Sequence, residues 1–303
     1  MRIISLISSA TEIVSSLGCS DSLVGISHEC DYPEKISALP VCSEPKFDVS
    51  GSSLDVDKQV KSLLQEALSI YRIKEDKISK LKPDIIITQS QCKVCAVSLD
   101  DVQNALKKQL GIKPLIISLE PNNLNDVLMD IQNLGNILGK DQLAKTIINT
   151  FKTEIDHLKK INRNNKKNTV ACIEWIDPLM YAGNWVPEIV GIAGGDDLFG
   201  LNGEHSSWSE YSTLFKKNPD KIIFMPCGYD IKKTKSEVKS LYHMRGWSDL
   251  KAVKSGNTYI ADGSQYFNRP GPRLLDSIKI MHDIVSDTDS YGFHGTGWEK
   301  III

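Results

Sequence analysis

Short apolar runs alternate with longer amphipathic stretches over the first 120 residues. The runs are about five residues long and rich in β-branched residues, which favours buried strands over helices. These strands are predicted at residues 2–6, 23–27, 84–88 and 114–118. Between them, apolar residues recur with a helical period at residues 9–18, 53–71, 76–82 and 98–111. The alternation of strand and helix predicts a parallel sheet with helices on both faces.

The second half of the chain repeats this alternation after two consecutive helices. The helices are predicted at 123–139 and 141–162, and the second is about 33 Å long at 1.5 Å per residue. Further strands are predicted at 169–175, 221–226 and 258–263, and further helices at 185–195, 210–219, 235–244 and 271–287. The pattern therefore predicts an α/β protein with two Rossmann-like lobes, each with a mainly parallel sheet, joined by one long helix.

Four segments follow from this pattern. Residues 1–122 form an N-terminal α/β lobe, 123–165 the linking helices, 166–287 a C-terminal α/β lobe, and 288–303 a surface extension with little periodicity. In open parallel sheets, ligands bind just past the carboxyl ends of the strands. We therefore expect a ligand in the cleft between the lobes, lined by the segments that follow the strands.

Composition and charge narrow the classes of function. Hydrophobic residues make up 41% of the chain and its formal net charge is −2, which gives no electrostatic case for binding nucleic acid or a membrane surface. No apolar run approaches the roughly 20 residues that span a bilayer. The N-terminal segment lacks the long apolar region of a secretory signal, which predicts a cytoplasmic protein, or an extracytoplasmic one if the chain is a trimmed mature form.

Seven cysteines in a chain of 303 residues do not suggest a disulfide framework. Cys92 and Cys95 form a C-x-x-C motif after the strand at 84–88, and a zinc site would need two more ligands. The thiols could bind a metal or cluster, form a redox dithiol, or line the pocket of a soft ligand. The candidate metal ligands are His28, Cys30, Cys92, Cys95 and Cys227.

Aromatic residues gather where the strands of the second lobe end. Together they suit a large flat or amphipathic ligand that binds by stacking and apolar contact. The sequence has no G-x-G-x-x-G, P-loop, G-x-S-x-G or H-E-x-x-H motif. The aromatic residues are Trp175, Tyr181, Trp185, Trp208, Tyr229, Tyr266 and Phe267.

Five stretches carry a resemblance to a known family. They are "RIISLISSATEIVSSLGCSDSLVGISHECDYP", "LKPDIIIT", "EWIDPLMYAGNWVPEIVGIAGGDDLFG", "WSEYSTLFKKNPDKIIFM" and "YFNRPGPRLLDSIKIM". In this order, over about residues 2–285, the chain resembles the substrate-binding proteins of ABC importers for cobalamin and iron-siderophores. Each stretch alone is loosely defined, whereas their order and spacing are specific at the level of the fold.

The resemblance implies a monomeric, non-enzymatic protein with the class III substrate-binding-protein fold, which needs no cofactor. It implies that a corrinoid or other metal chelate binds between the lobes and that an ABC-transporter permease is a partner. It also implies docking on the permease through one acidic residue per lobe, with Asp55 in the first lobe and Asp196 or Asp197 in the second. The implied ligand-binding residues are Tyr32, Gln91, Trp175, Trp185, Trp208, Tyr229, Tyr266, Phe267 and Arg269.

The sequence also departs from the family pattern. Residues 46–80 contain an extra helix, and the thiols of Cys30, Cys92, Cys95 and Cys227 are unusual for the family. These departures leave an alternative: a cytoplasmic protein that reuses this scaffold for a cysteine-ligated metal or cluster, or for a dithiol redox site.

Overall fold

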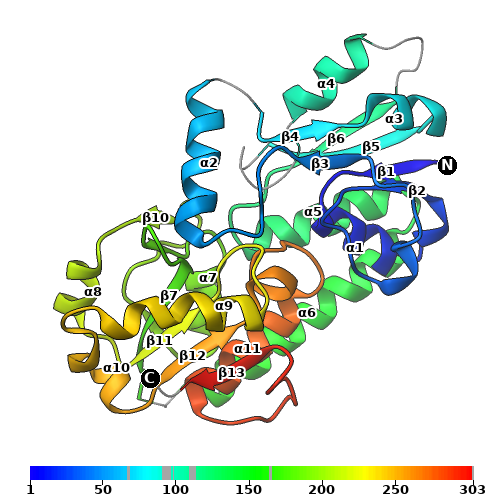
Figure 1. Ribbon diagram of the computed structural model, residues 1–303. Coiled ribbons are helices and arrows are strands. Elements are labelled where there is room, and N and C mark those ends of the chain that lie inside the picture. The colour runs from blue at the N-terminus through cyan, green and yellow to red at the C-terminus, as the bar shows by residue number, and fades with distance from the viewer. Residues whose placement is uncertain (67–68, 91–96, 98, 109–113, 164–165, 302–303) are drawn as a thin grey trace. The chain divides into compact units, whose positions relative to one another are not determined.

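The computed structural model describes residues 1–66, 69–90, 97, 99–108, 114–163 and 166–301 (Figure 1). The chain divides into two compact units. The first comprises Met1–Gly51, Asp55–Pro121 and Asn125–Ile148, and the second Ser52–Leu54, Asn122–Leu124 and Asn149–Ile303. The long helix α6 (Asp141–Ile161) contributes to both units. The lobe limits expected from the sequence stay predictions.

The first unit contains a parallel sheet of four strands in the order β2-β1-β5-β6. These strands are β1 (Ile3–Ser5), β2 (Leu23–Ile26), β5 (Ile85–Gln89) and β6 (Leu115–Leu119). A separate antiparallel pair is formed by β3 (Ser43–Pro45) and β4 (Tyr71–Ile73). The helices that surround them are α1 (Ser8–Ser16), α2 (Ser53–Gln65), α3 (Glu75–Leu81), α4 (Leu99–Lys108) and α5 (Leu124–Ile137).

Buried apolar side chains explain how this unit holds together. Ile4 and Ile86 of the sheet pack in one cluster with Ile78 of α3, and Val60 and Leu63 of α2 pack against it. Apolar residues of α1 and α5 are also fully buried, among them Ile13, Val14, Val127, Ile131 and Leu134. The removal of this apolar surface from water supplies the main stabilisation of the unit.

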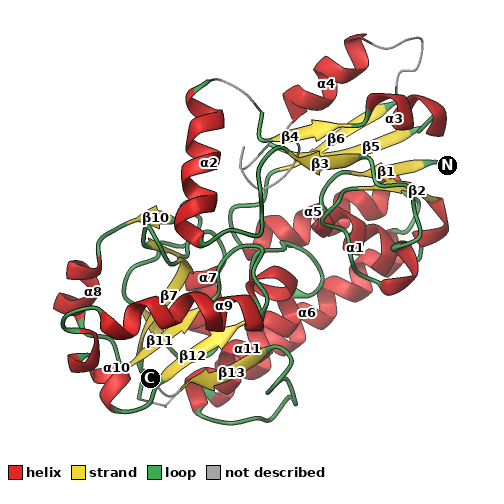
Figure 2. Cartoon of the chain, viewed as in Figure 1, coloured by secondary structure: helices red, strands yellow, loops and turns green. Residues whose placement is uncertain are grey.

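The second unit contains a mixed sheet in the order β10-β8-β7-β11-β12-β13, with β9 also paired to β7 (Figure 2). The pairs β7–β9, β7–β11 and β11–β12 are parallel, whereas β8 pairs antiparallel with β7 and β10, and β13 pairs antiparallel with β12. The strands are β7 (Thr169–Trp175), β8 (Met180–Tyr181), β9 (Asp196–Asp197), β10 (Ser207–Trp208), β11 (Lys221–Phe224), β12 (Thr258–Ala261) and β13 (Trp298–Ile301).

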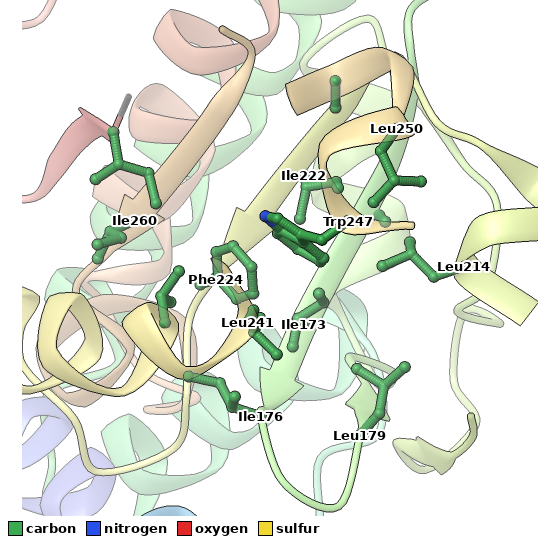
Figure 3. Close-up of a cluster of buried hydrophobic side chains, with 14 of the residues drawn as sticks. Ile173, Ile176, Leu179, Leu214, Ile222, Phe224, Leu241, Trp247, Leu250 and Ile260 are labelled. Carbon is green, nitrogen blue, oxygen red and sulfur yellow. The ribbon is translucent and has the colours of Figure 1, made fainter. Parts of the chain in front are cut away.

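The core of the second unit centres on Trp247, which is fully buried (Figure 3). Its ring lies 6.1 Å from that of Phe224 on β11 and packs with Ile173 of β7 and Leu214 of α8 in the same cluster. Helix α7 packs against α11. The helices of this unit, besides α6, are α7 (Val186–Ile192), α8 (Tyr211–Lys217), α9 (Ile231–Val238), α10 (Lys251–Lys254) and α11 (Leu274–Ser286).

The two units share a local motif that fixes a central strand. In each, a helix ends in a residue with positive φ (44° or 48°), followed by Pro-Asp and a parallel strand. The Asp84 carboxylate accepts the backbone N–H of Arg2 at 2.7 Å, just ahead of β1. The Asp220 carboxylate accepts the N–H of Thr169, the first residue of β7, at 2.8 Å. The same short sequence therefore aligns neighbouring parallel strands in both sheets.

The predicted alternation of strands and helices is confirmed, with three differences: the end of one helix, the C-terminal segment and six short strands. The expected helix 53–71 ends at Gln65, and Tyr71 begins β4, because the apolar spacing continues past the helix into the strand. Residues 288–303, expected as a surface extension, contribute β13, whose Trp298 is buried. The six strands β3, β4, β8, β9, β10 and β13 were not predicted, since two to four residues carry too little periodicity.

Candidate functional site

The carboxyl ends of three adjacent parallel strands meet at one edge of the second unit's sheet. Strand β11 lies between β7 and β12, and Phe224 pairs with both Ile173 and Ile260. The chain leaves these strands through Trp175, the segment 225–230 and the segment 262–273. The structure therefore brings together most of the ligand-binding residues that were predicted for the second half.

A β-bulge at Glu174 sets the direction of Trp175. Ile173 pairs with Tyr181 and Trp175 with Met180, so β7 has one extra residue at Glu174. In a regular strand, Trp175 would face the same side as Ile173, which belongs to the core. The bulge changes this register and places Trp175 opposite Met180.

Three apolar side chains consequently lie in register across three strands. Met180 of β8 pairs with Trp175 on one side and with Trp208 of β10 on the other. Residues directly opposite each other in antiparallel strands share a face of the sheet. Trp208 is 55% exposed, which is unusual for so large an apolar side chain. We call Trp175, Met180 and Trp208 the cross-strand apolar face.

Tyr229, in the segment after β11, extends this aromatic group. The centroid of its ring lies 5.2 Å from that of the Trp175 ring. The Lys233 ammonium lies 4.4 Å from the same Tyr229 ring centroid. The Tyr229 carbonyl accepts the N–H of Ser264 at 3.1 Å, which joins the segments after β11 and β12. Tyr229 is itself buried, so it positions Trp175 and Lys233.

Two buried arginines lie in the segment after β12. Arg273 donates to the Gln265 side-chain oxygen at 3.3 Å, and Arg269 donates to the Ser264 hydroxyl at 3.5 Å. Asp262 fixes the turn because its carboxylate accepts the Gln265 N–H at 2.8 Å. Burial raises the pKa of Asp262, although both guanidinium groups act in the opposite direction. The predicted residue Arg269 thus lies with Arg273 beside the same turn.

Two predicted binding residues are part of the scaffold. Phe267 is fully buried, and Trp185 is buried and donates its indole N–H to the Phe267 carbonyl at 2.8 Å. Tyr266 is half-buried, with its ring 5.7 Å from that of Phe293. Trp185 and Phe267 therefore support the segment after β12, and their contact with a ligand stays a prediction.

Glu174 is a site residue that sequence reasoning missed. The Ser206 hydroxyl donates to the Glu174 carboxylate at 2.9 Å and accepts the Gly183 N–H at 3.1 Å. Burial raises the Glu174 pKa to about 7, while the Ser206 hydrogen bond and His205 act to lower it. A single Glu near the end of a strand gives no sequence signal, because the bulge that creates its position depends on the pairing with β8.

In the first unit, His28 is held in a defined orientation. Its Nδ1 lies 2.9 Å from the Ser43 hydroxyl, and its ring centroid lies 5.3 Å from that of Tyr71. Burial and the charge of Lys74 lower the His28 pKa to about 4, with Glu44 opposing. His28 is therefore neutral at pH 7, which is the form that ligates metals. Its Nε2 lies 3.9 Å from the Glu29 carboxylate.

The predicted cysteine site receives no support from the residues that the structure describes. Among these, no group of three or more His, Cys, Asp and Glu side chains could hold a metal ion. Cys30 is buried, with its sulfur 3.1 Å from the Thr11 hydroxyl, and Cys227 belongs to the other unit. Gln91, Cys92 and Cys95 lie outside the described residues. Tyr32, on the loop after β2, is 48% exposed.

The three candidate docking acids differ in their surroundings. Asp55 on α2 and Asp196 are exposed. Asp197 is largely buried; its carboxylate accepts the N–H groups of Phe199 and Gly200 at 2.9 and 2.8 Å, and burial raises its pKa to about 6. Asp196 and Asp197 form β9 beside the start of β7. Docking stays a prediction, and Asp197 has a structural role.

The sequence was compared with families of known proteins. It matches the model of the periplasmic binding protein family over residues 3–264. The chain belongs to this family. Periplasmic binding proteins bind ligands and do not transform them, so the prediction of a non-enzymatic binder is confirmed. The resemblance to substrate-binding proteins of ABC importers is confirmed as well.

Two relatives show which kinds of protein this chain is similar to in sequence. An uncharacterized ABC transporter substrate-binding lipoprotein, YvrC of Bacillus subtilis (strain 168), is 23% identical over 297 residues, covering 95% of this chain and 81% of its own. The vitamin B12-binding protein of Vibrio vulnificus (strain CMCP6) is 25% identical over 289 residues, covering 92% and 87%. Neither resemblance supports the cytoplasmic prediction, since the first relative is a lipoprotein.

Solved structures confirm the predicted class III fold. The periplasmic vitamin B12 binding protein BtuF of Vibrio cholerae superposes with a TM-score of 0.67 at 21% identity, covering 95% of this chain and 98% of its own. IsdE of S. aureus complexed with heme superposes with a TM-score of 0.69 at 18% identity, covering 94% and 98%. Within the described ranges, no helix of this periplasmic binding protein is long and apolar enough to cross a membrane.

Proposed function

We propose that this chain is the solute-binding component of an ABC importer and binds a corrinoid or a related metal-containing macrocycle. The observation that carries the proposal is the cross-strand apolar face of Trp175, Met180 and Trp208 at the carboxyl edge of the second unit. Relatives that bind vitamin B12 and a structural neighbour that holds heme support the same ligand class.

The chemistry of this face suits a flat macrocycle. Indole rings offer wide apolar surfaces, and the Met180 thioether adapts its shape to an irregular partner. Corrinoids and hemes also carry polar groups at their periphery. Lys233, beside the Tyr229 ring, and Arg269, in the segment after β12, are two cations of the second unit that could bind such groups.

His28 is our candidate ligand for the chelated metal. It is neutral at pH 7, and its Nδ1 contact with Ser43 leaves Nε2 as the nitrogen that could bind a metal. A histidine whose other nitrogen is fixed by a hydrogen bond is the usual arrangement in metal sites.

The cysteine-based alternative is less well supported. Cys30 is buried with its sulfur 3.1 Å from the Thr11 hydroxyl, and among the described residues no group of three or more His, Cys, Asp and Glu side chains could hold a metal ion. We also propose an extracytoplasmic location and an ABC permease as the partner, because the first relative is a substrate-binding lipoprotein of an ABC transporter. Asp55 and Asp196 are the candidate docking residues.

Two single substitutions test the proposal. Quenching of tryptophan fluorescence should report the binding of cyanocobalamin or hemin to the wild-type protein. Trp175→Ala and Trp208→Ala should each weaken binding about tenfold or more, as is typical for central aromatic contacts. Met129→Ala is the matched control, because Met129 is 54% exposed on α5 of the other unit. Unchanged affinity in both tryptophan variants would remove the cross-strand apolar face from the site.

A further inference from the structure

Three helices of the second unit end at the amino edge of its sheet. Helices α6, α8 and α10 each precede a parallel strand, namely β7, β11 and β12 (α8 and α10 in Figure 1). Each helix has two lysines in its last turn, where cations interact favourably with the helix carbonyl end. These are Lys159 and Lys160, Lys216 and Lys217, and Lys251 and Lys254.

Hydrogen bonds and an ion pair join segments that link these helices to their strands. Asp220, three residues after Lys217, accepts the backbone N–H and the hydroxyl of Thr169, each at 2.8 Å. Thr169 in turn follows Lys166 and Lys167 by two or three residues. Lys251 of α10 forms an ion pair with the same Asp220. These contacts place the turn after α8, the start of α10 and the segment that leads from α6 into β7 at the same edge of the sheet.

Most cations on this surface have no acidic partner in the part of the chain that the structure describes. Lys251 pairs with Asp220, and Lys254 with Asp249 at 3.2 Å. Seven further cations are exposed, and no ion pair involves them within the described residues; we call them the basic face. They are Lys159, Lys160, Arg163, Lys166, Lys167, Lys216 and Lys217.

The charge of this face is not balanced locally. Asp156 on α6, Asp196 on β9 beside Thr169, and Asp287, which pairs with Lys221 at the start of β11, are exposed acids near this face. Seven cations without an ion pair among the described residues therefore outnumber these three acids, in a protein whose formal net charge is −2. Ile161 is 45% exposed among these cations and adds an apolar side chain to the face.

The basic face and the candidate ligand site lie at opposite ends of β7. The basic face borders Thr169, the first residue of the strand, and the cross-strand apolar face includes Trp175, the last. Six steps of about 3.3 Å separate these residues by about 20 Å. The basic face therefore has no part in holding the ligand, and its charge needs another explanation.

We propose that the basic face binds a membrane surface that contains anionic phospholipids. Six of its seven cations are lysines spread over the ends of two helices and the turn after one of them, an arrangement suited to many diffuse headgroup charges. Nucleic-acid sites more often combine arginines with aromatic rings that stack on bases, and the basic face contains no aromatic residue. Ile161 would insert at the level of the headgroups.

Vesicle sedimentation tests the proposal on the full chain. At about 50 mM salt, the protein should bind vesicles of equal phosphatidylglycerol and phosphatidylcholine, but not phosphatidylcholine alone, and about 500 mM salt should release it. The variant K159E/K160E/K166E/K167E should lose about 100-fold or more of its affinity, since each cation near an anionic surface contributes substantially. The control K35E/K58E/K80E/K232E has the same net charge and changes exposed lysines elsewhere; its affinity should change less than about threefold.

Several results would overturn the proposal. These are the absence of binding to anionic vesicles, an equal loss in the two charge variants, or tighter binding to double-stranded DNA than to the vesicles. Circular dichroism checks the fold of each variant, and K216E/K217E, on a different helix, provides a second test. Binding of cyanocobalamin or hemin should be unchanged in all these variants, so failure of the proposed ligand function would be seen separately.

Discussion

Two buried residues, His28 and Glu174, should make the stability of the folded protein depend on pH in opposite directions. The folded state lowers the pKa of His28 to about 4 and raises that of Glu174 to about 7. Burial is the main cause in both cases, because it disfavours the charged form of each group. His28 is the proposed metal ligand, and Glu174 occupies the bulge that directs Trp175. Titration of these two residues therefore reports on a candidate residue in each unit.

For His28, stability should fall as the pH decreases from about 6.5 to about 4. In this range the unfolded chain binds a proton at His28 and the folded chain does not, so acid favours unfolding. His28→Asn should reduce the difference in melting temperature between pH 7 and pH 5, since Asn does not titrate. An NMR titration that gives His28 a pKa of 6.5 or higher would contradict this account.

For Glu174, stability should fall as the pH rises from about 4.5 to about 7. The folded state keeps the proton that the unfolded chain releases in this range. Glu174→Gln mimics the protonated form and should raise the melting temperature at pH 8 more than at pH 5. Ser206→Ala is the control, because it removes the hydrogen bond that favours the charged carboxylate. A Glu174→Gln effect that is equal at both pH values would contradict the raised pKa.

Histidine ligation makes a prediction of its own. Hemin bound to the wild-type protein should show the Soret band of a histidine-coordinated iron, and His28→Ala should shift this band. His205→Ala is a matched control on the second unit. A Soret band unchanged in His28→Ala and shifted in His205→Ala would assign the ligand to the other histidine.

At the scale of elements, the structure separates tryptophans that stabilise the fold from those that form the site. Trp247 is fully buried between β11 and the helices, whereas Trp208 is exposed on β10. Trp247→Ala should lower the free energy of unfolding by about 3–5 kcal/mol, and Trp208→Ala by less than about 1 kcal/mol. Urea denaturation measures both. Equal losses would mean that Trp208 packs in the core.

The sequence predicted the parallel strands and the long helices because their apolar positions repeat clearly. It did not predict the antiparallel strands β8 and β10, which have two residues each. The bulge at Glu174 depends on the pairing with β8, so no sequence pattern could assign the direction of Trp175. The sequence also predicted Phe267 and Trp185 as ligand contacts, whereas in the structure they support the segment after β12. An aromatic residue after a strand can face a ligand or support a loop, and the sequence does not distinguish the two.

At the scale of the whole molecule, the small net charge does not reveal that positive charges are concentrated on one part of the surface. A value of −2 suggested no affinity for anionic surfaces, yet seven exposed cations gather at the amino edge of one sheet. The parallel topology places the ends of α6 and α8 at the same edge of the sheet, although they are more than 50 residues apart in the chain. Ligand binding at the carboxyl edge and membrane binding at the amino edge can therefore occur together in this unit.

The measurement that tests the central claim most directly is isothermal titration calorimetry of the wild-type protein. Cyanocobalamin, hemin and a ferric hydroxamate siderophore would be titrated separately at pH 7. The account predicts that a macrocycle, cyanocobalamin or hemin, binds one to one with a Kd below about 1 µM, equivalent to about −8 kcal/mol. If neither macrocycle binds with a Kd below about 100 µM, the proposed function is wrong.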